Sequence, residues 1–438
     1  MIETLKNAFA NKEIRKKIFL TLLLLLVFRL GCYIPVPGLA TGYLQDAVSG
    51  NDFLGLMSGI TGGALANGSL FALGIGPYIN ASIIVQLLTF GIPALERMSK
   101  EGEEGRKKIT NITRGVTIVL AVIQAIGIIV NFAGGFGDIS SSTSINGDIF
   151  FNQGWLAIIY MTIIYTAGAM LVMWLGERIT DYGVGNGISL IIFVGIISTA
   201  GTAILDKLME INFATGEVAP LFEVIGFFVL AIVLFFGIVY VDLAERKIPV
   251  QYAKQVRGTK MYGGQSSVIP MKITGSGVMP LIYSFAIISF PSMIMSLVPA
   301  WSGALEWWNG VFGSGTVWYV LVLTVFIFAF SFFQSGMQFN PEDVSKSIQQ
   351  NGGFIQGIRP GKPTAQYLKK INNRITLFGA IFLTIVSFVP SFIFSFVTVD
   401  LINVFSTTGI LIVVSVALEL DKQLQSQIMM KTYKGFLK

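Results

Sequence analysis

The chain has 438 residues, of which 53% are hydrophobic and only 12% are charged. Soluble domains carry charge at about 25% of their positions, so water is not the main solvent of this protein. It has no histidine and a single cysteine, Cys32. This excludes zinc sites built on histidine or several cysteines, serine–histidine triads, histidine proton relays and an intramolecular disulfide. We predict no catalytic residue, no bound metal and no cofactor.

Ten apolar runs approach the length of about 20 residues that a helix needs to cross a bilayer. They are 18–33, 69–90, 116–132, 155–175, 184–203, 221–241, 275–297, 317–333, 377–396 and 401–418. The runs are continuous rather than alternating, which favours helices over barrel strands. We predict an all-α integral membrane protein with ten transmembrane helices in two inverted five-helix halves, since an odd number of spans reverses the second half.

The amino terminus, residues 1–17, is predicted to be a cytoplasmic amphipathic segment. Basic residues before the first run match the start of a secretory signal, and 29–32 (RLGC) resembles a lipoprotein cleavage box. We reject both interpretations because Arg29 does not suit that box, no small-residue cleavage site follows, and nine further runs come later. Arg29 lies close enough to the end of its run to snorkel or to pair with a partner subunit.

Basic residues fix the orientation. Of the 30 Lys and Arg residues, 28 lie in the termini and in the loops after even-numbered runs; Lys207 lies in a loop after an odd-numbered run and Arg29 lies within the first run. Because cytoplasmic loops are enriched in Lys and Arg, we predict that both termini are cytoplasmic.

The segment 51–68 holds a short apolar stretch and contains Gly59, Gly62 and Gly63. It is too short and too rich in glycine to cross a membrane as a helix. An interfacial loop or a re-entrant segment inside a cavity both fit this pattern.

The remaining organisation follows from the runs. We predict an N-terminal half at 18–203, an external hinge loop at 204–220, a C-terminal half at 221–419 and a cytoplasmic tail at 420–438. Long basic loops at 244–274 and 340–376 are candidate docking surfaces for an acidic or RNA-rich partner, although basic loops also serve simply to fix topology.

Four short motifs identify a family resemblance. They are 34–38 (IPVPG), 71–79 (FALGIGPYI), 185–189 (GNGIS) and 357–361 (GIRPG). In their order and spacing they resemble the SecY family of protein-conducting channels, from the first run to the tenth. The glycines at 183–187 alone could suggest a nucleotide loop, but they lack a preceding strand and the proper spacing.

The resemblance implies a clamshell of helices around an hourglass pore with a narrow aliphatic ring. The implied ring residues are Ile75, Ile79, Ile188, Ile192, Ile282 and Ile412. An apolar constriction blocks ions by dewetting. Within the glycine-rich segment, residues from about 54 to 67 then correspond to a mobile, loosely packed plug. Leu54, Leu56, Met57, Gly59, Gly62 and Gly63 are among its residues.

The resemblance also places a lateral gate between the second and third spans on one side and the seventh and eighth on the other. Its implied residues are Asn80, Ile83, Gln124 and Pro291. Amides within apolar runs are expected to face a partner helix or the pore, and Pro280 and Pro291 could bend the seventh span.

The implied partners are the SecE and SecG subunits, the SecA ATPase motor, the ribosome, signal peptides, secretory polypeptides and membrane lipid. The implied contact residues for SecA and the ribosome are Arg246, Lys247, Lys254, Arg257, Lys260, Arg359 and Lys362. The location implied is the bacterial cytoplasmic membrane. No Walker A motif is present, so energy is expected from a partner.

Two other classes of function fit this sequence less well. A secondary transporter of a small solute is the main alternative, because inverted halves and helix interruptions suit it. Ion-coupled transporters usually bury carboxylates or histidine near the bilayer midplane, and these runs contain almost none. An intramembrane enzyme would need a nucleophile beside a base, and no such pair is visible.

Overall fold

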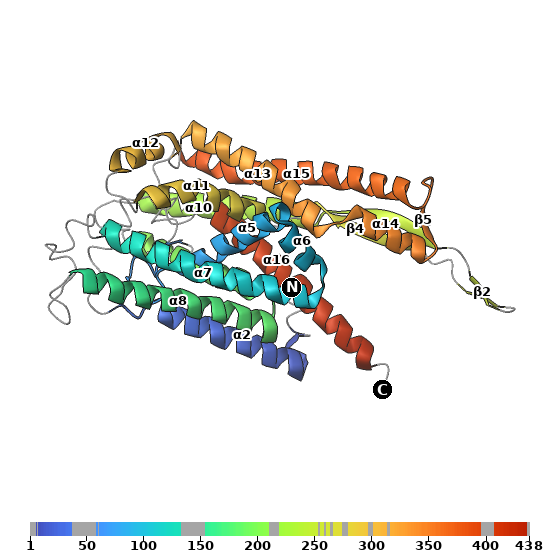
Figure 1. The fold of residues 1–438 in the computed structure, drawn as a ribbon, viewed down its shortest axis with the longest axis horizontal. Coiled ribbons are helices and arrows are strands. Elements are labelled where there is room, and N and C mark those ends of the chain that lie inside the picture. The colour runs from blue at the N-terminus through green and yellow to red at the C-terminus, as the bar shows by residue number, and fades with distance from the viewer. Residues whose placement is uncertain are drawn as a thin grey trace.

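The computed structural model describes residues 6, 8–36, 58–59, 61–132, 154–209, 219–252, 255–257, 260–262, 266–273, 279–296, 301–312, 316–395 and 407–435. The described chain is mostly helical, and most of the long helices run along the longest axis of the molecule (Figure 1).

Each predicted apolar run overlaps a helix of the described residues. These helices are α2 (Lys12–Gly31), α5 (Gly76–Gly91), α7 (Glu103–Phe132), α8 (Gly154–Tyr182), α9 (Gly187–Met209), α10 (Ala219–Leu243), α11 (Met279–Ser296), α13 (Val317–Gln338), α15 (Lys362–Ser395) and α16 (Thr407–Gly435). Shorter helices are α6 (Pro93–Lys100), α12 (Ser302–Phe312) and α14 (Pro341–Gln350). Within the described residues, four helical stretches are long and apolar enough to cross a membrane, and five if the bent pair α5–α6 is one span.

Helix α5 starts at Gly76, whereas the sequence predicted a helix from residue 69. Residues 70–75 form turns, and Gly74 has a φ of 51°, a left-handed conformation that does not continue a helix. Pro77 lies in the first turn of α5, where its missing N–H costs no hydrogen bond. The helix ends at an extended residue, Ile92, because Pro93 disfavours the helical conformation before it. There α5 and α6 bend by 106°.

The helices pack in two groups that follow the chain. In the first group α2 contacts α8 and α9, while α7 packs between α5 and α8. In the second group α13 packs between α11 and α15, and α16 contacts α10 and α15. The groups meet where α9 contacts α10 and α16, and where α11 contacts α5 and α7. The fold therefore has two seams between its halves.

Large apolar side chains cover much of the outer surface. On α10, Val233 is 62% exposed, Phe236 is 67% exposed and Tyr240 is 80% exposed. An apolar surface this extensive marks contact with another apolar phase. The outward faces of the helices thus suit lipid, as the composition predicted.

The all-α prediction omitted a small antiparallel sheet. Strand β1 (Glu245–Tyr252) lies between β4 (Ser266–Lys272) and β5 (Gly353–Ile355), while β2 (Gln255–Arg257) and β3 (Lys260–Tyr262) form a separate hairpin. Val250 pairs with Ile355, which joins the loops 244–274 and 340–376. Only Ile248 and Val250 of β1 are buried, so the apolar pattern is too short to have revealed a strand.

The sheet has its own core. Ile248, Val250 and Ile355 pack against Ile348 of α14 and Leu368 of α15. Figure 1 shows the sheet, α14 and the hairpin at one end of the molecule and α12 at the other. The two basic loops therefore form a single platform, with the start of α15 packed against it.

Replacing Val250 with aspartate should unfold this platform. The side chain is fully buried, and burying an unpaired carboxylate there costs on the order of a few kcal/mol. We expect faster limited proteolysis of the full-length protein within residues 244–274. Gln251→Asp is the matched control, because Gln251 is the exposed neighbour on the same strand. Equal cleavage of both variants would contradict a folded platform.

Candidate functional site

The six isoleucines of the predicted pore ring lie in one apolar cluster. Ile75, Ile192 and Ile412 are among its buried members, and Ile79, Ile188 and Ile282 pack against it. They come from the start of α5 and from α9, α11 and α16. The cluster therefore draws on both groups of helices and lies where these groups meet.

The sequence around α9 explains how two of these isoleucines are positioned. Gly185 has a φ of 89°, and the Asn186 side chain accepts a hydrogen bond of 3.0 Å from the Ile188 N–H, which starts the helix. Ile188 and Ile192 are four residues apart and thus share one helix face. The glycine-rich motif at 183–187 starts a helix against α8, where a Cβ on Gly187 would overlap the carbonyl oxygen of Gly176.

All six predicted ring positions are isoleucine, so the side chains that meet there are aliphatic. An opening between such side chains excludes water and ions, because it offers no group to replace their hydration. Flexible aliphatic side chains can also move aside for a passing chain without requiring particular hydrogen bonds. This arrangement suits a seal or a constriction rather than a catalytic centre.

The described part of the predicted plug is folded against the first group of helices. Leu54, Leu56 and Met57 lie outside the described residues. Gly62 and Gly63 have φ values of 73° and 83°, which favour glycine, and Gly59 is half-buried. Ala64 and Leu65 are buried, so this part is more closely packed than the predicted loose element.

Arg29 makes contacts that the sequence did not reveal. Its Nη1 donates a 2.7 Å hydrogen bond to the Gly62 carbonyl, and its Nη2 donates a 2.8 Å hydrogen bond to the Tyr33 hydroxyl. The guanidinium carbon also lies 4.7 Å from the centre of the Tyr33 ring. Arg29 thus binds within its own chain, where the sequence had suggested snorkelling or a partner subunit.

One of the predicted lateral-gate residues, Ile83 of α5, lies at the seam between α5 and the helices α11 and α13. Ile83 is buried against Tyr283 and Phe330. Gln124 is buried and Asn80 is half-buried. Pro291 lies inside α11, whereas Pro280 lies in its first turn and so does not bend the helix.

A hydrogen bond that the sequence did not reveal joins α5 and α11 across this seam. The Tyr283 hydroxyl of α11 donates to Oε1 of Gln86 in α5 at 2.8 Å, and the Gln86 amide donates to Ser82 at 3.3 Å. The ring centroids of Phe90 in α5 and Phe333 in α13 lie 4.7 Å apart, which is a second contact across the seam. The rule that drew attention to Asn80 and Gln124, an amide within an apolar run, applies equally to Gln86.

The predicted docking residues gather on the platform. Arg246 and Lys247 are exposed on β1, Arg257 pairs with Lys260 in the β2–β3 hairpin, and Lys362 starts α15. Lys254 lies outside the described residues. Nearby, partial burial lowers the pKa of Lys272, and the neighbouring Lys422 lowers it further.

Arg359 is exposed on a turn whose shape is fixed on both sides. Gly357 and Gly361 have φ values of 81° and 94°. The Thr364 hydroxyl donates to the Arg359 carbonyl at 2.8 Å, and the Ser345 hydroxyl of α14 donates to the Gly361 carbonyl at 2.7 Å. The turn therefore presents the guanidinium outward from a rigid support.

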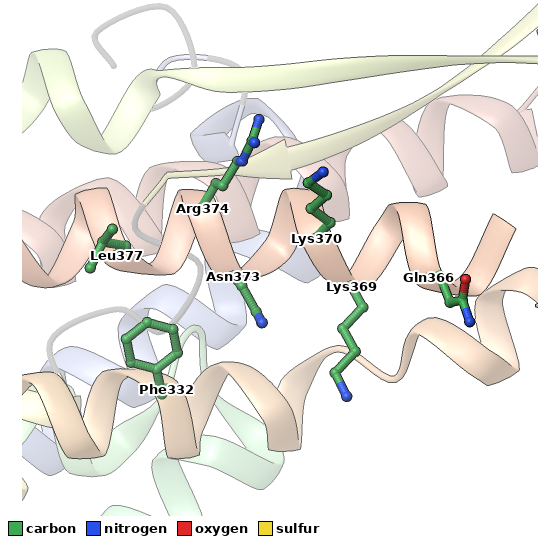
Figure 2. A pocket seen from close by; sticks show the side chains of 7 residues that line it. All are labelled: Phe332, Gln366, Lys369, Lys370, Asn373, Arg374 and Leu377. Carbon is green, nitrogen blue, oxygen red and sulfur yellow. The ribbon is translucent and has the colours of Figure 1, made fainter. Parts of the chain in front are cut away.

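A hollow between α13 and α15 lies apart from these features. It is lined by Phe332, Gln366, Lys369, Lys370, Asn373, Arg374 and Leu377. Figure 2 shows that Lys370 and Arg374 leave α15 on the side opposite to Lys369 and Asn373. The cations do not converge on one point, so the hollow is not a built anion site.

The chain matches one known protein family over most of its length. The family model described as SecY matches residues 69–420. The protein translocase subunit SecY of Streptomyces coelicolor is 38% identical to this chain over 444 residues, covering 100% of both chains.

Solved structures share the fold. A SecY protein, solved to show that its plug domain stabilises the closed state of the translocation channel and maintains a membrane seal, has a TM-score of 0.65 at 19% identity, covering 94% of this chain and 91% of that one. Sec61 in the canine ribosome–channel complex has a TM-score of 0.60 at 17% identity, with the same coverage.

The Tyr283–Gln86 hydrogen bond should couple α11 to α5. Interhelical hydrogen bonds between apolar helices contribute about 0.6 kcal/mol on average and up to about 1.7 kcal/mol. We expect a coupling energy of about 0.5–1 kcal/mol in a double-mutant cycle of Tyr283→Phe and Gln86→Leu. The measurement is reversible unfolding in detergent micelles. Effects that simply add would show that the two side chains do not interact.

Proposed function

Since this chain belongs to the SecY family and is a pore-forming subunit of the protein translocation channel in a membrane, we propose that it passes unfolded secretory polypeptides across the bacterial cytoplasmic membrane and releases membrane-protein segments sideways into lipid. The observation that carries this proposal is the convergence of six isoleucines from both helix groups in one apolar cluster.

The proposed pore runs through that cluster. A polypeptide would displace the isoleucine side chains, which close around it and keep ions out. The uncharged lining accepts any sequence, because it requires no specific hydrogen bond from the moving chain. Ten spans in two inverted halves, 18–203 and 221–419 with a hinge at 204–220, would form the clamshell, and the pairing of helices within each group supports it.

The proposed lateral gate is the seam between α5 with α7 and α11 with α13. The contacts that support it are Ile83 against Tyr283 and Phe330, and the Tyr283–Gln86 hydrogen bond. A signal sequence would separate these helices by replacing weak apolar contacts with its own. Residues 54–67 would be the plug that covers the cluster when no chain is present.

The platform of loops 244–274 and 340–376 is the proposed docking surface for the SecA motor and the ribosome. Ribosome-bound relatives share this fold, and exposed arginine and lysine suit RNA and acidic protein surfaces. SecE and SecG are proposed as companion subunits, with both termini of this chain in the cytoplasm. Because the sequence lacks a Walker A motif, the chain would be a passive conduit that depends on these partners for energy.

Family membership favours a channel over the alternative of a solute transporter. The sequence points the same way, because its ten apolar runs contain almost no carboxylate that could bind a coupling ion.

A photo-crosslinking residue at Ile282 or Ile412 should capture a stalled secretory chain. Both positions belong to the apolar cluster, so the passing chain would lie within van der Waals reach. The measurement is crosslinked product in vesicles with a translocation intermediate. Position Ile197 is the control, because it lies on α9 but is 46% exposed on the outer surface. Equal capture at Ile197, or none at Ile282, would contradict the pore.

Arg359→Glu should slow SecA-dependent translocation by about tenfold or more, since reversing a charge at a contact costs roughly 2 kcal/mol or more. The control is Gln356→Glu, which adds a carboxylate to the same exposed turn and leaves Arg359 in place. Translocation is measured as protease-protected product per unit time. A normal rate for Arg359→Glu would remove this residue from the contact surface.

A further inference from the structure

Side chains from two different helices bind backbone carbonyls of the segment 58–68. Arg29 of α2 donates to the Gly62 carbonyl at 2.7 Å. The Thr199 hydroxyl of α9 is shared between the Gly59 carbonyl at 3.2 Å and the Gly195 carbonyl of its own helix at 3.1 Å. The thiol of Cys32, which follows α2, donates to the Thr61 carbonyl at 3.7 Å. The segment is thus tied at three carbonyls within four residues.

Arg29 is the strongest of these ties. A hydrogen bond from a charged donor is roughly twice as strong as one between neutral groups. A charged side chain within an apolar helix is costly and is typically retained for function. Tyr33 holds the guanidinium from its other edge, through its hydroxyl at 2.8 Å and its ring at 4.7 Å. The donor is therefore kept in place independently of the segment that it binds.

The segment approaches both helices too closely for any residue but glycine at position 62. A Cβ on Gly62 would lie 2.7 Å from Nη1 of Arg29 and 3.0 Å from the Cα of Gly195 in α9, and its φ is 73°. The contact thus wedges the backbone at residue 62 between α2 and α9. Cys32, with no exposed surface, lies beneath the same segment.

We propose that Arg29 is the latch that holds the plug closed. The plug opens only when the hydrogen bond between Arg29 and the Gly62 carbonyl breaks. The proposal rests on the assignment of residues 54–67 as the plug. Arg29 acts as a positioning residue, since it binds the backbone of the plug at Gly62. Contact with Tyr33 would keep the guanidinium in place after its hydrogen bond to Gly62 breaks. The hydrogen bond can therefore form again when the channel empties.

Cys32 provides a direct test, because it is the only cysteine of the chain. The assembled channel in vesicles is treated from outside with a small water-soluble methanethiosulfonate reagent, and labelling of Cys32 is followed with time. Arg29→Met should raise the labelling rate by about 10- to 100-fold, the effect expected for loss of a charged hydrogen bond, and should raise ion leak in parallel. Arg29→Lys should give a labelling rate between those of the unaltered protein and Arg29→Met. A lysine ammonium keeps the charge but cannot place two N–H groups as the planar guanidinium does.

Several controls separate the latch from other causes. Cys32→Ser gives the background. Arg178→Met removes a guanidinium that lies over Trp174 and Tyr182, far along the chain from the plug, and should change nothing. If Arg29→Met fails to assemble, Thr199→Val loosens the Gly59 carbonyl without altering α2 and should raise labelling less strongly.

The outcomes distinguish the latch from the plug itself. Deleting residues 54–67 should raise ion leak more than Arg29→Met does. If the deletion raises leak but Arg29→Met leaves Cys32 labelling and leak at the level of the unaltered protein, the plug stands and the latch is wrong. If the deletion leaves leak unchanged, residues 54–67 are not a seal, and the proposed role of the latch fails with it.

Discussion

Backbone polar groups away from water must find partners within the protein, and this constraint governs the whole structure. Long helices meet it internally. Residues 58–59 and 61–75 meet it only in part, because their glycines break the helix. Side chains of Arg29, Cys32 and Thr199 bind three of their carbonyls. At the exposed turn around Arg359, hydroxyls of Thr364 and Ser345 also bind carbonyls and fix the shape of the turn.

Packing between the halves follows from a second consequence of an apolar surrounding. Lipid is as apolar as isoleucine, so burying an isoleucine between helices gains little beyond close packing. The cluster of isoleucines is held by the packing of apolar side chains from both groups of helices. Polar ties lie around it, at Tyr283–Gln86 and Arg29–Gly62. Separating the two groups of helices would therefore cost little free energy beyond lost packing and these hydrogen bonds.

The platform shows how loops far apart in the chain become one surface. Strand β1 carries basic residues on its exposed positions and buries Ile248 and Val250 against α14, α15 and β5. The pairing of Val250 with Ile355 brings Arg246 and Lys247 onto the same small unit as Arg359. A partner would therefore meet a folded, rigid basic surface rather than two independent loops.

The amino-acid sequence by itself determined the helices, the membrane environment and the family, because continuous apolar runs, basic loops and short motifs are local properties. It could not determine the start of α5, which depends on turns around Gly74, or the sheet, whose strands pair across about a hundred residues of chain. Nor could it show the partner of Arg29 or the bond between Gln86 and Tyr283. Those contacts depend on which helices lie side by side, and only tertiary packing decides that.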